Sequence, residues 1–263
     1  MLPILMMLVA LFTGPEEPLE GLIEPLVVVD VGAAVDGLLD EVLVDRGDLV
    51  EAGQPVARLE SSVEELTVEL ARMRAESDSA IRGIEARLVF NENVLKRSEA
   101  MWKDELISYE QLEESRANVD VTKADLALAK DNQTMARLEH ARSQAALDLR
   151  TIRSPVRGAV VERYLSPGEL VNRTNQLEIV RIAQLDPLRV EVIAPLEMLG
   201  TVAVGARAVV LPDEPIGGQH DAVVTVVDRV VDAASGTFRI RLELPNSDYA
   251  IAAGVKCRVR FVP

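Results

Sequence analysis

The longest regular pattern of apolar residues lies in the middle of the chain. Residues 61–150 contain no proline and a single glycine, Gly83, and they are rich in Ala, Glu, Leu, Arg and Lys, which favour helix. In the second part of this segment, apolar and small residues recur with the seven-residue spacing of a coiled coil. The predicted contact face consists of Leu112, Ser115, Val119, Thr122, Leu126, Ala129, Gln133, Ala136, His140, Ser143 and Leu147.

The first part of the same segment carries a second stripe, with a slip near Ser77. Its predicted members are Val63, Leu66, Leu70, Met73, Ile84, Leu88, Asn91, Leu95, Ser98 and Trp102. Ser108 and Gln111 form a capping box, which marks a new helix after a break at residues 103–107. The pattern predicts one antiparallel hairpin over residues 61–148, with its turn between Trp102 and Ser108 and arms about 60 Å long.

An internal repeat flanks this helical segment. Residues 35–59 align without a gap with residues 156–180, at an offset of 121. The matched residues are Val35, Gly37, Glu41, Gly47, Leu49 and Val50 in the first copy, and Val156, Gly158, Glu162, Gly168, Leu170 and Val171 in the second. Gly37 and Gly158 open short apolar strands, whereas Gly47 and Gly168 stand where a tight turn requires positive φ. Each copy is therefore predicted to form half of one small β-sandwich.

The last third of the chain alternates short apolar strands with turn residues. Residues 188–193, 222–227 and 237–244 are predicted strands, and Gly205, Pro212, Gly217, Gly218 and Asn246 separate them from their neighbours. This spacing is typical of a small antiparallel barrel. Cys257 alternates with Val255 and Val259, so we expect a buried, inert thiol.

The chain begins with an uncharged apolar run, residues 1–13, followed by a turn-rich segment. The run is shorter than the roughly 20 residues that a membrane-spanning helix needs, and it resembles the apolar part of a signal peptide. No Lys or Arg precedes Arg46, so the usual positive flank is missing. We expect export or a membrane anchor.

Composition and charge exclude several classes of function. The chain has 43 acidic and 28 basic residues, a net charge of −15, which repels nucleic acid. The single cysteine permits no internal disulfide, and His140 and His220 are far apart in the sequence, so no metal site is expected. No phosphate-binding glycine loop or nucleophile motif is present. We expect a non-enzymatic protein without a cofactor.

The split repeat and the hairpin together resemble the periplasmic adaptor, or membrane fusion protein, family of HlyD-like proteins, in particular the adaptors of resistance-nodulation-division efflux pumps. The resemblance rests on the two repeat copies, on residues 152–158 re-entering the second copy, and on residues 230–238, 244–246 and 253–255, which are similar to that family's barrel. It implies an elongated α+β protein, in which a lipoyl-like β-sandwich is split by an antiparallel coiled-coil hairpin and followed by a small antiparallel β-barrel.

The resemblance also implies domain limits. Residues 1–25 are expected to form a leader and linker, residues 26–60 with 151–185 the lipoyl-like domain, residues 61–150 the hairpin and residues 186–263 the barrel. Family members usually carry a membrane-proximal domain after the barrel. Because this sequence stops at Pro263, that domain is expected to be absent or truncated.

The function implied by the family is that of an adaptor in the periplasm of a Gram-negative bacterium. Such an adaptor links an inner-membrane transporter of the resistance-nodulation-division type to an outer-membrane channel of the TolC type, and several copies associate into a ring that forms a sealed conduit for small molecules. The family pattern at the hairpin tip, which faces the channel, matches Arg97, Met101 and Ser108, with Met101 replacing a leucine. Ser108 serves equally well as a helix cap.

Two other classes of function compete with the adaptor. A biotin or lipoyl carrier has the same two glycine-punctuated halves, but it presents a modified lysine on the turn that joins them. Here the hairpin takes the place of that turn, and no lysine lies between Arg58 and Lys96. A coiled-coil scaffold without a transport role is compatible with the same folding pattern.

Overall fold

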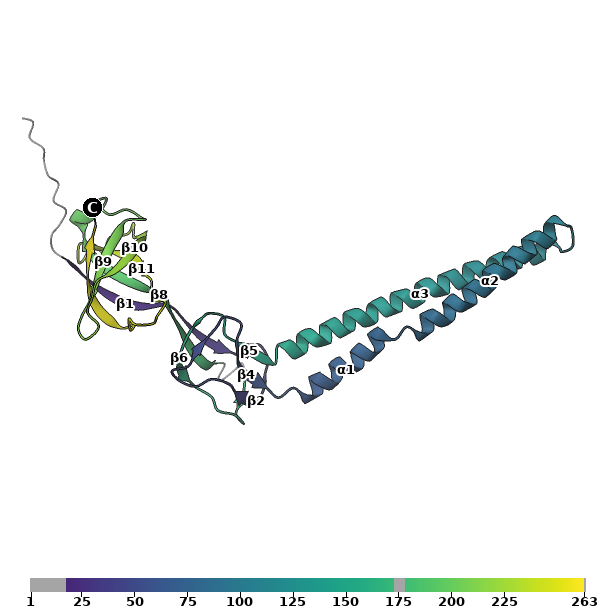
Figure 1. The fold of residues 1–263 in the computed structure, drawn as a ribbon, viewed down its shortest axis with the longest axis horizontal. Helices are drawn as coiled ribbons and strands as arrows, with labels where there is room; N and C mark the ends of the chain where they lie inside the picture. Colours follow the sequence, from purple (N-terminus) through teal and green to yellow (C-terminus); the bar gives the residue numbers. More distant parts are fainter. Residues whose placement is uncertain (1–17, 173–177, 263) are drawn as a thin grey trace, which may run out of the picture. The chain divides into compact units, whose positions relative to one another are not determined.

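The computed structural model describes residues 18–172 and 178–262, so residues 1–17 of the expected leader lie outside the described residues. The described residues fall into two compact units. One runs to Arg58 and resumes at Ile152, and the other is Leu59–Thr151, which contains the three α-helices (Figure 1). Among the described residues, no helix is long and apolar enough to cross a membrane.

The helical unit is an antiparallel hairpin. Its first arm consists of α1 (Ser62–Glu76) and α2 (Ser79–Lys103), and its second arm is the single helix α3 (Tyr109–Asp148). Both α1 and α2 lie along α3 (Figure 1). The first arm breaks at residues 77–78, at the predicted slip, and the turn occupies residues 104–108, where the capping box placed it.

The contact face predicted for α3 is confirmed, because each of its residues is buried or half-buried. On α2, the predicted residues from Ile84 to Ser98 are half-buried, but Trp102 is exposed. Polar contacts set the register: Asn91 Nδ2 donates to Thr122 Oγ1 at 2.8 Å, and the hydroxyls of Ser98 and Ser115 lie 3.0 Å apart. Arg87 and Asp125 form an ion pair across the same face.

The stripe predicted for α1 is wrong. Its four residues, Val63, Leu66, Leu70 and Met73, are 51 to 72 % exposed. The residues that face α3 are instead Glu64, Val68, Ala71 and Ala75. The two alanines are 6 % exposed, and their small side chains permit close approach to α3. Glu64 is held there by an ion pair with Arg150. Periodicity marks both stripes on this helix but does not decide which one meets the partner helix.

The repeat copies interlock within the first unit. The first copy contributes β2 (Gly37–Val42), β3 (Leu49–Val50) and β4 (Pro55–Leu59), and the second contributes β6 (Gly158–Arg163), β7 (Leu170–Val171) and the start of β8 (Glu178–Pro195), while β5 (Thr151–Arg153) leads into it. One sheet has the order β5-β4-β2-β7, and β3 pairs with β6 at the edge of the other sheet. Each copy therefore pairs with strands of the other copy.

The pairing has the two-fold symmetry that the repeat predicts. Gly37 lies opposite Val171 in the pairing of β2 with β7, and Gly158 lies opposite Val50 in the pairing of β3 with β6. Adding 121 to residue 37 gives residue 158, and subtracting 121 from residue 171 gives residue 50, so the repeat offset converts the first pair into the second. The backbone hydrogen bonds repeat as well: Leu39 N–H donates to Glu169 O at 2.8 Å, and Val160 N–H donates to Asp48 O at 2.9 Å.

The ungapped alignment ends after Val171. Leu43 N–H donates to the carbonyl oxygen of Val56, whereas the equivalent Tyr164 N–H donates to that of Ile179, two positions beyond the residue that the offset predicts. The second copy is therefore two residues longer between Val171 and Ile179. The segment that holds these two additional residues includes residues 173–177, which are not described.

The barrel has six strands that close on themselves. They follow the order β1 (Leu19–Gly32), β12 (Val255–Phe261), β9 (Arg207–Pro212), β10 (His220–Val227), β11 (Thr237–Leu244) and β8, and β1 pairs again with β8. A 3₁₀ turn, Leu196–Met198, follows β8. The core contains Ile23, Leu188, Val190, Val192, Val210, Ile240, Leu242 and Val259, each at most 1 % exposed. Residues 19–25, expected to be linker, are therefore part of the barrel.

Candidate docking site at the hairpin tip

The end of α2 is closed by backbone hydrogen bonds. Leu106 N–H donates to Met101 O at 2.8 Å, and Glu105 N–H donates to Trp102 O at 3.0 Å. Glu105 has a φ of 58°, the left-handed conformation that usually calls for glycine at this position. These bonds define a Schellman motif, which turns the chain away from the α2 axis.

The start of α3 is closed by side chains. Gln111 N–H donates to Ser108 Oγ at 3.3 Å, and Ser108 N–H donates to Gln111 Oε1 at 3.1 Å, so the predicted capping box is present. Ser108 therefore has a structural role whatever else it contacts. Together the two caps satisfy backbone groups on either side of a short turn and make the tip a defined surface.

This surface is unusually apolar for a helix connection. Met101 and Trp102 are each 44 % exposed, Tyr109 is 61 % exposed and Leu106 is 68 % exposed. The rings of Trp102 and Tyr109 meet edge to face, with their centroids 6.5 Å apart, so these two side chains support each other across the turn. We call Met101, Trp102, Leu106 and Tyr109 the tip patch.

Of the three residues expected at the tip, Met101 and Ser108 lie at the end of the hairpin. Arg97 lies one helical turn before Met101 on the same exposed side of α2, because residues four apart share a helix face. The sequence reasoning missed Leu106 and Tyr109, and it assigned Trp102 to the contact face. Large apolar residues in and beside a predicted turn were the available signal for this patch.

The four repeat glycines have two different roles. Gly47 and Gly168 adopt φ values of 95° and 88°, as the turn prediction required. Gly37 and Gly158 instead begin strands β2 and β6. At Gly158 a Cβ atom would clash with the backbone of Ala183 on β8. These glycines therefore serve backbone geometry, by turn conformation at Gly47 and Gly168 and by close approach of β8 at Gly158.

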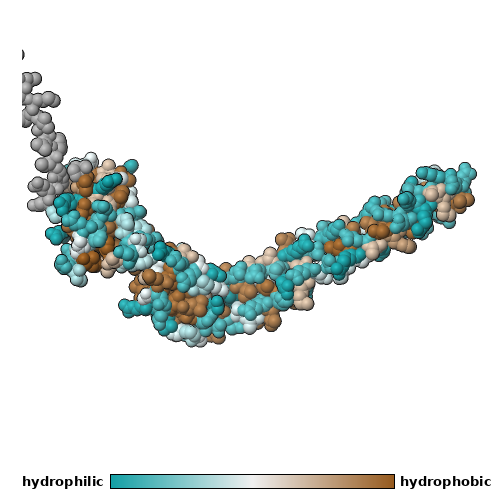
Figure 2. Space-filling model, viewed as in Figure 1, coloured by the Kyte–Doolittle hydropathy of each residue, from teal (hydrophilic) through white to brown (hydrophobic). Residues whose placement is uncertain are grey.

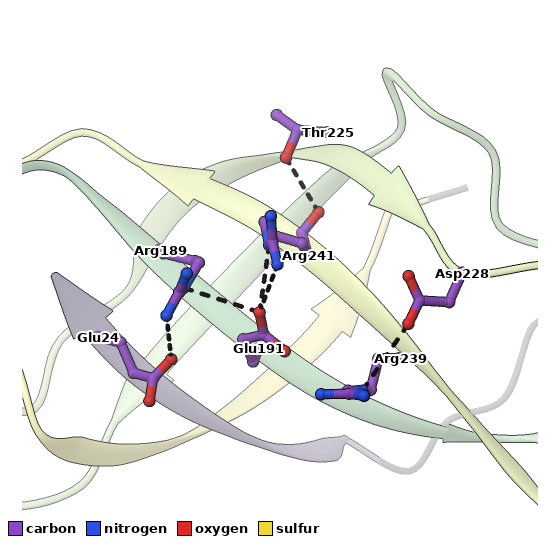
Figure 3. Close-up of polar contacts among 7 residues, drawn as sticks. All are labelled: Glu24, Arg189, Glu191, Thr225, Asp228, Arg239 and Arg241. Carbon is purple, nitrogen blue, oxygen red and sulfur yellow. Dashed lines mark hydrogen bonds and ion pairs between the residues drawn. The ribbon is translucent and has the colours of Figure 1, made fainter. Parts of the chain in front are cut away.

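A chain of charged residues crosses the outer face of the barrel (Figure 3). Arg189 Nη2 lies 2.8 Å from Glu24 Oε2, and its Nε lies 3.7 Å from Glu191 Oε1. Arg241 Nη2 reaches the same Glu191 oxygen at 3.0 Å. These ion pairs join the neighbouring strands β1, β8 and β11, so they support the pairing of strands within the barrel.

The described residues contain no cluster of three or more His, Cys, Asp or Glu side chains that could hold a metal ion. Cys257 is 2 % exposed, and burial raises the pKa of its thiol to about 12, so the thiol is protonated at neutral pH. Among the described residues at the hairpin end, the exposed apolar side chains of the tip patch are the feature that favours contact with another protein.

Comparison with known proteins identifies the family. Residues 27–184 match the model of the CzcB-like barrel-sandwich hybrid domain. The chain belongs to this family, and its split sandwich, helical hairpin and closed barrel make it a membrane fusion, or periplasmic adaptor, protein of the efflux-pump class. The family resemblance and the fold class inferred from the sequence are thus confirmed.

Individual relatives are distant but extensive. The chain is 24 % identical to the UPF0194 membrane protein YE2891 of Yersinia enterocolitica, over 89 % of this chain and 86 % of that protein. It is 24 % identical to the multidrug resistance protein MdtA of Salmonella typhimurium, over 84 % of this chain and 52 % of that protein. The crystal structure of MacA from Actinobacillus actinomycetemcomitans aligns with a TM-score of 0.68 and 21 % identity, over 93 % of this chain and 78 % of that one.

Proposed function

We propose that this protein is a non-enzymatic adaptor in the periplasm of a Gram-negative bacterium. It links an inner-membrane transporter of the resistance-nodulation-division type to an outer-membrane channel of the TolC type. Several copies form a ring that acts as a sealed conduit for drugs or other small molecules. In this arrangement the barrel and the lipoyl-like domain engage the transporter, and the hairpin tip engages the channel.

The observation that carries the proposal is the tip patch. A loop between two helices normally presents polar groups to water, because apolar surface that is exposed to water does not stabilise the isolated chain. Here four large apolar side chains surround a turn that is rigidly capped on both sides. Such a surface fits an apolar contact with another protein, with Arg97 and Ser108 as polar contacts at its edge.

The competing carrier function requires a lysine on the turn that joins the two halves of the sandwich. The segment between β4 and β5 is the helical hairpin, and its first lysine, Lys96, lies well along α2. This disfavours a biotin or lipoyl carrier. A coiled-coil scaffold without transport remains the main competitor, and the tip distinguishes the two, because a scaffold needs no apolar tip.

Site-specific photo-crosslinking tests the proposal. A photoreactive phenylalanine analogue replaces Leu106 in the full chain, in cells of the native host. Irradiation should give a covalent product with an outer-membrane channel, identified by mass spectrometry. The matched control replaces Val230, which is 81 % exposed on the barrel and lies outside the tip patch. That position should give no product with the channel.

Loss of function provides the second arm of the test. Replacing Met101 and Leu106 with lysine puts charge into the tip patch, at positions already 44 % and 68 % exposed, so the fold should persist. Export of the pump's substrates should fall to the level of the deletion strain. Full export by this variant, together with no channel product from position 106, would favour the scaffold.

A further inference from the structure

Exposed aliphatic side chains gather at one end of the barrel. They are Leu196, Leu199, Val204, Val230 and Val262, which are 44 to 81 % exposed. They lie on the segment between β8 and β9, on the loop between β10 and β11, and directly after β12. Figure 2 shows hydrophobic residues among hydrophilic ones on the surface of the barrel. We call these five residues the rim patch.

Backbone contacts place these segments at the same end of the barrel. Leu196 N–H donates to Gly236 O at 3.0 Å, which joins the segment after β8 to the loop before β11. Val262 N–H donates to Arg207 O at 2.9 Å, which joins the end of β12 to the start of β9. Val204 precedes Arg207 by three positions in the sequence. All three segments of the rim patch therefore meet at this end.

The opposite end of the barrel has a different surface. Its loops are residues 213–219, between β9 and β10, and residues 245–254, between β11 and β12. Neither loop exposes a large aliphatic side chain in the described structure. The charged residues of these loops are Asp213, Glu214 and Asp248, all acidic. The exposed aliphatic residues are thus a property of one end of the barrel and not of its loops in general.

Arginines accompany the rim patch. Arg207 and Arg260 are exposed near the ends of β9 and β12, and Arg229 is exposed beside Val230. Within the described part of the chain, none of these three arginines forms an ion pair. Arg241, by contrast, is paired with a glutamate on the neighbouring strand β8. The rim therefore offers basic groups that can pair with anions of a partner.

The acidic residues of the rim segments are mostly engaged within the barrel. Asp228 lies 3.8 Å from Arg239, and Asp232 accepts a backbone hydrogen bond within its own loop at 2.9 Å. Glu197 is the remaining acidic residue of the two segments 196–206 and 228–236. The available charge at the rim is thus basic, in a chain whose net charge is −15.

This combination of groups fits a lipid surface. Protein interfaces are usually built around aromatic side chains in closely packed pockets, but residues 196–206 and 228–236 contain no aromatic residue. Aliphatic side chains on separate segments fit a bilayer better, because the headgroup region is fluid and needs no matching shape. Arginine can extend its charged group to lipid phosphates while its alkyl chain lies along apolar surface.

The start of the chain lies at the same end of the barrel. Leu19, the first residue of β1, lies opposite Val259 near the end of β12. Only residues 14–18 separate Leu19 from the apolar run of residues 1–13. Five extended residues span at most about 18 Å. If that run is held in a membrane, as expected from the sequence, the rim lies within this distance of it.

We propose that the rim patch and its three arginines bind the periplasmic surface of the inner membrane. The aliphatic side chains enter the headgroup region, and the guanidinium groups pair with the phosphates of anionic lipids. The proposal rests on the periplasmic location of the proposed function and specifies which end of the barrel faces the bilayer. The acidic loops 213–219 and 245–254 then face away from the lipid.

A fluorescent probe on the rim tests the proposal. An environment-sensitive dye is attached to Val230→Cys in the full chain, and the matched control carries the dye at Ser247→Cys, at the opposite end of the barrel. Native Cys257 is 2 % exposed and stays unlabelled. Vesicles of phosphatidylethanolamine and phosphatidylglycerol should shift the emission at position 230 to shorter wavelength. Lipids brominated on their acyl chains should quench it, and the probe at position 247 should show neither change.

The other outcomes overturn the membrane contact. If the chain floats with the vesicles but neither probe changes, residues 1–13 alone hold it there and the rim does not touch lipid. If both probes change, the contact is not specific to the rim. If the probe at position 230 responds only when the transporter is present in the membrane, the rim binds protein.

Failure of the proposed function is recognised separately. If position 106 gives no product with an outer-membrane channel but the probe at position 230 enters the lipid, the adaptor function is wrong and the membrane contact stands. If the channel product forms and the probe at position 230 does not respond to lipid, the adaptor stands and the membrane contact is wrong.

Charge removal provides an independent readout. In the labelled Val230→Cys chain, replacing Arg207, Arg229 and Arg260 with glutamine should lower the ratio of lipid-bound to free rim about fivefold for each arginine. The matched control is Arg137→Gln, at an exposed position on α3, which should leave the ratio unchanged. Vesicles of phosphatidylcholine alone should reduce the difference between the variants. Equal quenching in all variants on the anionic vesicles would show that the arginines do not contact lipid phosphates.

Discussion

Gly158 and Ala183 lie so close that no side chain fits between them. A Cβ atom built on residue 158 would stand 2.7 Å from the carbonyl carbon of Ala183 and closer still to its oxygen. Strand β6 begins at Gly158 and pairs with β8 from the next residue, where Ala159 lies opposite Ala183. The second repeat copy is thus joined to the long strand β8 at a point that requires glycine.

Gly158→Ala should therefore destabilise the protein, because either β6 or β8 must move. We expect a loss of roughly 1 to 3 kcal/mol in the free energy of unfolding, as for other overpacked sites. The control is Gly83→Ala on α2, where a Cβ meets nothing within 4 Å and alanine should stabilise the helix by about 1 kcal/mol. Urea unfolding followed by circular dichroism measures both. Equal effects of the two substitutions would contradict the close approach at Gly158.

Glu105→Gly should stabilise the hairpin turn. Glu105 holds a left-handed φ of 58°, which costs a non-glycine residue about 1 kcal/mol. Glycine removes that cost while keeping the Schellman hydrogen bonds. The neighbouring Asp104 has a φ of −90°, so Asp104→Gly should give no such gain. The melting temperature of the helical circular dichroism signal compares the two variants. A lower melting temperature for Glu105→Gly would show that Glu105 does not hold the left-handed conformation.

Adjacent substitutions on α1 distinguish its two stripes. Leu70 is 51 % exposed, so Leu70→Ala should change the stability of the monomer by less than about 0.5 kcal/mol. Ala71 is 6 % exposed against α3, so Ala71→Leu should overpack the contact and cost about 1 to 3 kcal/mol. Unfolding at concentrations where the chain is monomeric provides the measurement. If Leu70→Ala costs more stability than Ala71→Leu, the stripe predicted from periodicity is the one that packs against α3.

The Asp30–Arg181 pair on β1 and β8 should make stability depend on pH in acid. Arg181 Nε donates to Asp30 Oδ1 at 2.6 Å, and this hydrogen bond holds the pKa of Asp30 below its ordinary value. Because the folded-state pKa is lowered, the stabilisation is present above the unfolded pKa of about 4 and is lost as pH falls through the folded value. Both side chains are over a third exposed, so the contribution should stay below about 1 kcal/mol.

Arg181→Gln tests this pair. The difference in unfolding free energy between this variant and the natural chain should be largest near neutral pH and should shrink in strong acid. A residual difference should persist at low pH, because the Arg181 guanidinium also lies over the Tyr164 ring, 5.5 Å from its centroid. A difference that grows on acidification would contradict the assigned pKa direction.

Local chemistry explains why several features could be predicted from the sequence. The turn of the hairpin follows from Ser108 and Gln111, whose side chains cap a helix wherever it packs. The interlocked sandwich follows from the repeat, because glycines and apolar residues in matched register impose matched strands. The buried face of β11 follows from the alternation of Phe238, Ile240, Leu242 and Leu244. The cap and the strand alternation need only neighbours in the sequence, and the sandwich needs only the comparison of the two repeat copies.

Other features depend on contacts between distant segments. The pattern marks two stripes on α1, and only the packing against α3 selects the small residues Ala71 and Ala75 over Leu66 and Leu70. In the sequence alone, residues 19–25 look like a linker. In the structure they close the barrel, because β12 and β8 offer backbone hydrogen-bonding groups on both sides of them. The tip patch likewise emerges only when the two caps bring Trp102 and Tyr109 together. A residue's partner is a property of the folded chain, and periodicity by itself cannot name it.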